Sequence, residues 1–414
     1  MKILLIIWIS ILILTGSYFR TRNLQEIETY GIDWFIIVQL FVCALGGIVC
    51  TNSILKYYKW GLGTKALLVF VTIAALSAFF TPFPTKVIGY WILLAGVSLL
   101  TINLVQKANT QKELTQIENA WFITITLIII KDTIISLLFP ELQSEWDYGR
   151  LGMGVTHANK ISFLAALAFW LSFTKEQRKF PVLIWLSRIL FLLVILLARS
   201  RIALICLIIG GIVRLWFSNL NKDLRGLAFR TIIPYLFLHV VLLFFLLLKT
   251  EAPLIVAIFN IINRGQDRID IASLTGRTKI WHSAIIESLK DPVTFIFGHG
   301  YGMSDNILND STWSFDFYIY HAHNDFLEIL LNMGLIGLII FIVLVAYSIS
   351  WMTKFTQMQK KYSPDFVLRA ISVIVMILVY SITEVNFGNK IGPVVVIYMF
   401  YILALDRRNN IKPI

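Results

Sequence analysis

Long apolar segments alternate with short polar ones along most of the chain. Runs of about 17 to 25 apolar residues are long enough to cross a bilayer as helices. The pattern predicts about twelve such spans, near residues 3–19, 34–50, 65–81, 87–105, 120–139, 157–174, 181–198, 201–217, 230–249, 326–351, 367–383 and 391–405. One longer polar stretch, 250–325, interrupts the series. We therefore expect an all-α polytopic membrane protein with one large loop.

Composition agrees with this interpretation. Hydrophobic residues make up 58% of the chain and charged residues 14%, against about 45–50% and about 25% in soluble domains. The first apolar run follows Lys2 but lacks a small-x-small cleavage site, so we interpret it as a span rather than a signal peptide. Cys43, Cys50 and Cys206 all lie in apolar runs. They indicate neither a disulfide framework nor a metal site.

The net charge of +12 reflects topology rather than a nucleic-acid partner. Most lysines and arginines lie in one set of alternate loops, such as those near 175–179 and 354–361. The positive-inside bias places that set, with both termini, in the cytoplasm. Loop 250–325 is then extracytoplasmic. Arg199 and Arg201 lie on this cation-poor side, and that exception requires an explanation.

The chain shows no internal repeat or linker, so we expect one transmembrane domain over 1–414 with an extracytoplasmic insertion at 250–325. Apolar residues at helical spacing predict an amphipathic helix over 278–289, which Asp291-Pro292 ends. Residues 293–297 are rich in β-branched and aromatic side chains and predict a short extended segment. The alternating glycines of 298–302 indicate a turn or a close backbone approach.

The strongest candidate for chemistry is the segment 321–328, where His321, His323, Asn324, Asp325 and Glu328 lie at the entry to a span. Two histidines two residues apart point the same way in an extended segment. An imidazole titrates near neutral pH and suits a general base. The alternatives are a histidine pair that hydrogen-bonds loop carbonyls, and a zinc site, which lacks accompanying cysteines or an HExxH motif.

The two carboxylates next to these histidines have competing interpretations. Asp325 and Glu328 form a D-x-x-E pattern ahead of an apolar run, which favours helix capping for Asp325. Glu328 lies in the first turn of the span and is a candidate to orient His323.

Arginines supply candidate anion-binding groups. Arg199 and Arg201 join two apolar runs across a very short turn. Arginine binds phosphate with two parallel hydrogen bonds, so we favour phosphate binding for Arg201. Snorkelling towards water explains Arg199 equally well. Arg277 opens the amphipathic helix, where free N–H groups attract anions, although a solvated surface arginine is the alternative.

A few ionisable groups lie inside the apolar runs, where they usually face a cavity or a partner. Lys131 and Asp132 are neighbours in sequence, so we expect them to pair elsewhere. Glu384 lies near the end of another run. His157 and Asn159 are candidates to line an external cavity.

Taken together, these motifs resemble the bacterial O-antigen polymerase and O-antigen ligase family of membrane glycosyltransferases. The resemblance covers about 195–345. It rests on Ser200-Arg201-x-Ala203, on 273–277 followed by Trp281, on Asp291-Pro292, on the 297–302 glycine turn and on 321–324 with Leu327, Glu328, Gly334 and Gly337 behind it. Phe297 is a mild departure, because a small or aliphatic residue is common before that turn.

The resemblance implies a glycan donor on a polyprenyl diphosphate, with no cofactor and no metal. The expected partners are this donor, an acceptor glycan, membrane lipids and a chain-length regulator. We expect His323, Arg277 and Arg201 to be catalytic, and His321, Arg199, Asn324 and Glu328 to bind substrate. The acceptor is either another lipid-linked repeat, as in a polymerase, or a lipid A core, as in a ligase. A lipid transporter or flippase and a structural assembly partner are the rival classes.

Overall fold

The computed structural model describes residues 61–138, 151, 157–173, 181–219, 277–310, 319–354, 357–358, 362–388 and 391–406, together with Phe41, Cys43, Ala44 and Ile48. All regular secondary structure in these ranges is helical. The predicted spans 3–19, 34–50 and 230–249 lie mostly or wholly outside them, so the expected total of about twelve spans stays a prediction. Residues 250–276 and 311–318 of the loop are also outside the described part.

Helices occupy the described spans where apolar runs predicted them. Among the described residues, four segments are long and apolar enough to cross a membrane: α4 with the 3₁₀ helix η1 (Leu62–Leu76 and Ser77–Phe80), α5 (Pro84–Lys107), α6 (Gln111–Leu138) and α16 (Asp325–Thr353). The remaining apolar helices are α7 (Ala158–Leu171), α8 (Pro181–Leu197), α9 (Arg201–Asn219), α18 (Pro364–Tyr380) and α19 (Pro393–Asp406).

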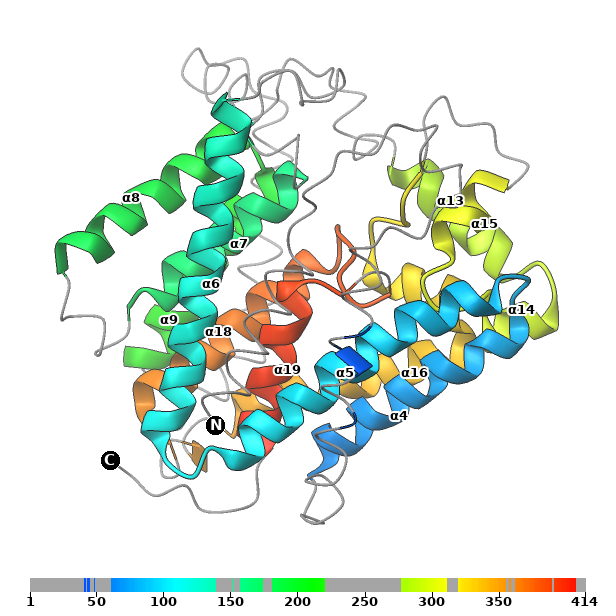
Figure 1. Ribbon diagram of the computed structural model, residues 1–414, viewed down its shortest axis with the longest axis horizontal. Coiled ribbons are helices and arrows are strands. Elements are labelled where there is room, and N and C mark those ends of the chain that lie inside the picture. Colours follow the sequence, from blue (N-terminus) through cyan, green and yellow to red (C-terminus); the bar gives the residue numbers. More distant parts are fainter. Residues whose placement is uncertain are drawn as a thin grey trace.

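The helices pack in two groups that meet at α19. On one side α4 packs against α16 and α5, and on the other α7 packs against α6, α8 and α9, while α18 packs mainly against α9 (Figure 1). Every side chain of α19 is buried, and the helix contacts α4, α5, α6 and α18. The core is therefore continuous between the groups.

A buried ion pair joins three helices in the second group. Arg369 on α18 donates to both oxygens of Glu118 on α6, at 2.8 and 2.7 Å. The hydroxyl of Tyr401 on α19 also donates to Glu118. A buried guanidinium and carboxylate need such complete pairing, because each alone would pay a large desolvation cost. The neighbours Lys131 and Asp132 also pair with each other, at 2.9 Å, a contact that adjacent positions on a helix did not lead us to expect.

The described part of the loop contains three short helices. Helix α13 (Arg277–Ser288) lies where the amphipathic helix was expected, and α15 (Ser304–Asp310) follows the glycine turn. The extended segment predicted over 293–297 was wrong, since Pro292–Phe297 forms helix α14. Asp291 caps α14 by accepting the N–H groups of Val293 and Thr294, and Pro292 supplies a favourable first position. These two local signals outweigh the β propensity.

The glycine turn fits into a break in α16. Gly334 has a positive φ of 65°, so α16 is interrupted there. The N–H groups of His299 and Gly300 donate to the carbonyls of Leu331 and Asn332 at this break. A Cβ on Gly298 would lie 2.4 Å from the Asn332 carbonyl carbon, so only glycine fits. The close backbone approach predicted from the glycine spacing is confirmed.

Candidate active site

The segment that carries the two histidines turns directly into α16. Asn324, rather than Asp325, is the N-cap: its side-chain oxygen accepts the N–H groups of Phe326 and Leu327 at 2.9 and 3.1 Å. Asn324 Nδ2 also donates to the carbonyl of Ile382. The capping role expected for Asp325 was therefore wrong. Sequence pattern alone could not separate the two, since both residue types cap helices well.

Asp325 instead binds a second chain segment, 381–388, which follows α18. Its Oδ1 atom accepts the N–H groups of Asn386 and Phe387 at 2.8 and 2.7 Å, and its own N–H donates to the carbonyl of Ser381. Asp325 is fully buried. These bonds fix segment 381–388 against the histidine segment and bring Glu384 into the site.

Glu328 supports the histidine segment from the other side. Its Oε2 atom accepts the N–H of Ala322 at 2.7 Å, and its Oε1 atom accepts hydrogen bonds from Ser304 and Asn332. Glu328 is fully buried. The contacts of its carboxylate are with the backbone between the two histidines, not with the imidazole of His323.

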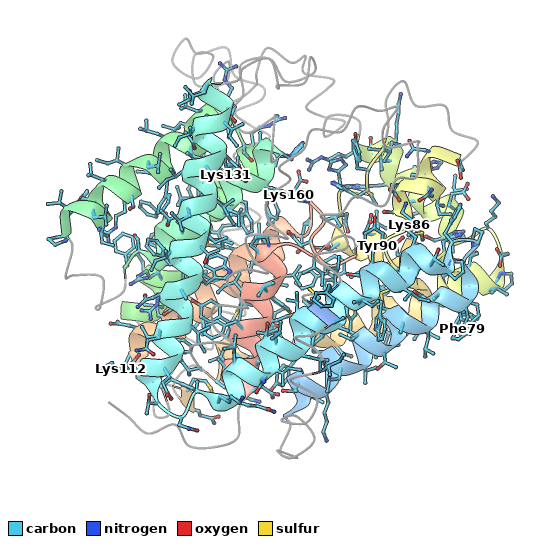
Figure 2. The ribbon with its side chains drawn as sticks, viewed as in Figure 1. Phe79, Lys86, Tyr90, Lys112, Lys131 and Lys160 are labelled. Carbon is cyan, nitrogen blue, oxygen red and sulfur yellow. The ribbon has the colours of Figure 1, made fainter. Side chains whose placement is uncertain are left out.

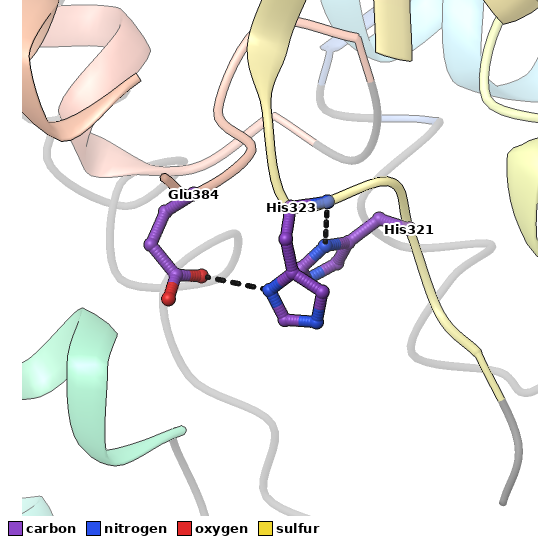
Figure 3. Close-up of side chains that lie close together, drawn as sticks. All are labelled: His321, His323 and Glu384. Atoms are coloured by element: carbon purple, nitrogen blue, oxygen red, sulfur yellow. Dashed lines mark hydrogen bonds and ion pairs between the residues drawn. The ribbon is translucent and has the colours of Figure 1, made fainter. Parts of the chain in front are cut away.

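His323 has an unusual backbone that presents its ring to Glu384. Its φ is +52°, a conformation that costs a non-glycine residue about 1–3 kcal/mol and often marks a functional position. Its N–H donates to His321 Nδ1 at 3.2 Å, and the two rings lie 4.2 Å apart. His323 Nδ1 lies 3.5 Å from Glu384 Oε2 (Figure 3). That is ion-pair distance, and it is slightly long for a hydrogen bond.

Glu384 is the carboxylate that the site shares. Its Oε1 atom accepts from Arg277 Nη2 at 2.5 Å and from Asn159 Nδ2 at 2.6 Å. Burial alone would raise the pKa of Glu384, but the charge of Arg277 and the imidazole of His323 outweigh it and hold the pKa well below its usual value. Glu384 is therefore an anion that pairs with both groups.

The hydrogen bonds assign a proton arrangement to the two imidazoles. Burial, followed by the neighbouring His323, lowers the pKa of His321 well below its usual value, so its ring is neutral. Since His321 Nδ1 accepts from the backbone, its proton is on Nε2. His323 Nδ1 faces the Glu384 carboxylate, and this contact favours the tautomer with its proton on Nδ1. Its Nε2 atom is then an available proton acceptor.

Arg277 is positioned by the same segment. It is the first residue of α13. Its Nη1 donates to the carbonyl of Thr383 and its Nη2 to Glu384. Guanidinium has five N–H donors in a fixed plane, so two bonds fix its orientation while other donors stay available for a ligand.

Arg201 opens α9, and helix register places it near this site. Cys206 Sγ on α9 contacts the carbonyl of Met376 on α18. Counting five residues from this contact towards the start of α9 and the end of α18, which run antiparallel, places Arg201 level with about residue 381. Arg199, in the preceding turn, is exposed and has a φ of +47°. The described residues thus bring His321, His323, Arg277 and Glu384 together, with Arg201 at the same end of the bundle.

A metal ion fits this arrangement less well. His321, His323 and Glu384 each offer one ligand atom, and these atoms lie within 4.8 Å of one another. Ligands of one tetrahedral zinc lie about 3.4 Å apart, given zinc–ligand distances of about 2.0–2.1 Å. Binding would require them to move closer, and Arg277 already neutralises the carboxylate. The geometry favours an acid–base pair.

Sequence reasoning did not connect Glu384 and Asn159 with the histidines. Both had been noted as polar residues near the ends of apolar runs, which was the available signal. Their pairing depends on the packing of α7 against α18, which no local pattern specifies.

Comparison with known families gives one match. A family model described as O-antigen ligase matches residues 186–342, close to the 195–345 expected from motifs. No curated protein matches the chain. The matched range includes Arg201, Arg277, His321 and His323, while Asn159 and Glu384 lie outside it.

Proposed function

Because residues 186–342 relate the chain to the O-antigen ligase and polymerase family, we propose that it moves a glycan from a polyprenyl diphosphate to an acceptor sugar hydroxyl. The reaction takes place at the outer face of the bacterial inner membrane. The observation that carries the proposal is the shared Glu384 carboxylate, which pairs with both a guanidinium and an imidazole. Such a site can neutralise a leaving group and deprotonate a nucleophile at adjacent positions.

The base in this proposal is His323 Nε2. It accepts the proton of the acceptor hydroxyl as the hydroxyl oxygen attacks the anomeric carbon. Glu384 holds the Nδ1 proton and stabilises the imidazolium that forms, as the carboxylate does in other carboxylate–histidine pairs. General base catalysis of this kind contributes about 10²–10⁴-fold.

The leaving group is the polyprenyl diphosphate. The bond between the anomeric carbon and the phosphate oxygen breaks, and its electron pair stays on the diphosphate. Arg277 and Arg201 stabilise that charge, an electrostatic contribution of a few kcal/mol per contact. Two guanidinium groups perform the charge neutralisation that a divalent cation performs elsewhere, so the proposed reaction is metal-independent. Arg199 contributes to anion binding at the same turn.

The remaining residues bind the acceptor or shape its site. His321 Nε2–H is a donor for an acceptor hydroxyl. Asn324 and Glu328, expected to contact substrate, use their side chains to hold the α16 start and the histidine segment. Their proposed contribution is therefore positional.

The acceptor distinguishes two versions of this reaction. We propose a second lipid-linked repeat unit, which makes the protein a surface-polysaccharide polymerase that works with a chain-length regulator, because such enzymes serve many surface polysaccharides. The alternative is transfer to a lipid A core, the acceptor expected for a ligase, and the matched family model is described as O-antigen ligase. In both versions of the reaction, Arg277 and Arg201 bind the same polyprenyl diphosphate donor.

A transporter or flippase of lipid-linked glycan is the rival from another class. Transporter sites usually lie near the bilayer midplane between repeated halves. Here Glu384 lies beyond the C-terminal end of α18, and His321 and His323 lie before the start of α16. Their position at helix ends favours chemistry at the membrane surface.

One assay separates these functions. Purified protein is mixed with polyprenyl-diphosphate glycan and either acceptor in the presence of EDTA. Polymerisation predicts chain growth on the lipid-linked repeat, ligation predicts a single transfer to lipid A core, and a transporter gives no product. Loss of transfer in EDTA that zinc or magnesium restores would contradict the metal-independent mechanism.

A further inference from the structure

The first turn of α7 lies at the candidate active site. The helix begins at Ala158, with His157 as its N-cap. Asn159 Nδ2 donates to Glu384 Oε1 at 2.6 Å, and one turn further Phe163 stacks on Tyr380 with ring centres 3.8 Å apart. These two contacts fix the N-terminal end of α7 against the segment that carries Glu384.

Lys160 follows Asn159 at this end of α7 (Figure 2). Its side chain is half-buried, and none of the ion pairs between described residues includes it. Burial and His323 are the largest causes of the low pKa of His321, and the positive charge of Lys160 contributes to it. The ammonium group therefore lies close enough to the histidine pair for its charge to act there.

Helix register places Lys160 near Arg201 as well. Trp170 on α7 donates to the carbonyl of Leu207 on α9 at 2.8 Å. The N–H of Leu151, shortly before α7, donates to the carbonyl of Leu197, shortly before α9. The starts of α7 and α9 therefore lie at the same end of the bundle, and the two helices run parallel. Counting six residues back from the contact between Trp170 and Leu207 in each helix places Arg201 level with Leu164. Lys160 is four residues before Leu164, so it lies about 6 Å farther along the axis towards the start of α7, at 1.5 Å per residue.

Among the residues that the structure describes, the charges near Lys160 do not balance without a ligand. Glu384 is the carboxylate at this position, and Arg277 already pairs with it at 2.5 Å. Asp325 and Glu328 face backbone N–H groups behind the histidine segment. The N-terminal ends of α7 and α9 add the positive ends of two helix dipoles. A half-buried ammonium without a counter-ion is costly, and a bound anion would compensate it.

We propose that Lys160 is a third cation of the diphosphate site and binds the lipid-linked donor together with Arg201 and Arg277. This inference rests on the proposed function, because it takes the donor to be a polyprenyl diphosphate. Arginine provides geometry through paired hydrogen bonds, whereas lysine acts as a point charge. Lys160 therefore senses the total charge of the ligand, and it favours a diphosphate over a monophosphate.

The test compares four forms of the full-length protein in lipid nanodiscs: wild type, Lys160→Gln, Lys160→Arg and Lys112→Gln. Lys112 is an exposed lysine at the far end of α6 (Figure 2). Binding of a short-chain polyprenyl diphosphate and of its monophosphate is measured for each. We expect Lys160→Gln to weaken diphosphate binding about tenfold, as for one charged contact, and monophosphate binding about threefold or less. Lys160→Arg restores most of the loss, and Lys112→Gln binds as wild type.

Equal affinities of wild type and Lys160→Gln for both lipids would overturn the inference. An equal loss for both lipids, or no rescue by arginine, would assign Lys160 a structural role instead. These binding results do not depend on turnover. A wild-type protein that binds the diphosphate through Lys160 but transfers no glycan would contradict the proposed function and leave this inference standing, whereas wild type that does not bind the diphosphate overturns it.

Discussion

Asn159 and Arg277 donate to the same oxygen atom, Glu384 Oε1, at 2.6 and 2.5 Å. They come from α7 and α13, more than a hundred residues apart in the chain, and leave Oε2 to face His323. One carboxylate thus sets the relative positions of the proposed base and one arm of the proposed diphosphate clamp. Its replacement should impair both functions together.

Glu384→Gln should therefore lower kcat by about 10²–10⁴-fold, because an amide neither stabilises the His323 imidazolium nor neutralises Arg277. The measurement is the glycan-transfer rate at saturating donor. Glu113→Gln, a change in the α6 first turn far along the helix from the site, is the matched control. A Glu384→Gln rate within a few-fold of wild type would remove this carboxylate from the mechanism.

Asn159→Ala tests the role of Glu384 by removing the hydrogen bond that Asn159 donates to its carboxylate. It removes one of the hydrogen bonds to a buried anion, a loss of about 1.5–3 kcal/mol for a charged contact. We expect a smaller fall in kcat than for Glu384→Gln, with the low pKa of Glu384 moved towards its usual value. A double substitution with Glu384→Gln should add little further loss, since the two residues act together. Additive losses would show that Asn159 acts independently.

The break in α16 predicts a sharp contrast between two glycines. A Cβ on Gly334 would lie 2.3 Å from the carbonyl oxygen of Ile296, and its φ of 65° disfavours any other residue. Gly334→Ala should lower the free energy of unfolding by about 2–4 kcal/mol. Gly89→Ala in α5, where nothing lies within 4 Å, should leave stability unchanged or raise it slightly. Thermal unfolding in detergent measures both, and equal melting temperatures would contradict the described break.

His321 predicts a pH dependence of stability. Burial and His323 lower its pKa in the folded state well below the usual value, which is about 6.5. Below that pH the unfolded chain binds a proton that the folded protein excludes, so stability falls as the pH decreases. His321→Gln should flatten the change in melting temperature between about pH 6.5 and 5. An unchanged slope would mean that His321 is not kept neutral.

Much of the fold followed from the sequence because the hydrocarbon thickness imposes a long, local signal. Each described apolar run forms a helix close to the predicted bounds, except that α6 begins at Gln111, nine residues before the predicted start at 120. Local signals also located α13 and the glycine turn. The prediction failed at Val293–Phe297, where a cap and a proline overrode side-chain propensity, and at Asp325, whose true partners are Asn386 and Phe387 some sixty residues away.

The candidate site also contains residues that local sequence identified and residues that only the tertiary structure connects with them. His321, His323, Arg201 and Arg277 were identified because their residue types and local contexts are unusual for a membrane protein. Glu384 was not linked to these residues, and the sequence instead predicted Glu328 to orient His323, which was wrong because Glu384 is the carboxylate that faces the imidazole. The difference between Glu384 and Glu328 arises from tertiary structure. Asp325 holds segment 381–388, which carries Glu384, beside His323, whereas the Glu328 carboxylate accepts the backbone N–H of Ala322. Adjacent sequence cannot show which carboxylate faces an imidazole.

The most direct test is the glycan-transfer rate of His323→Ala, measured on protein whose melting temperature and donor affinity match wild type. Removal of the base should lower kcat by about 10²–10⁴-fold while leaving the binding of polyprenyl diphosphate nearly unchanged, because Arg277 and Arg201 remain. Transfer at a rate close to wild type would contradict the assignment of His323 as the general base.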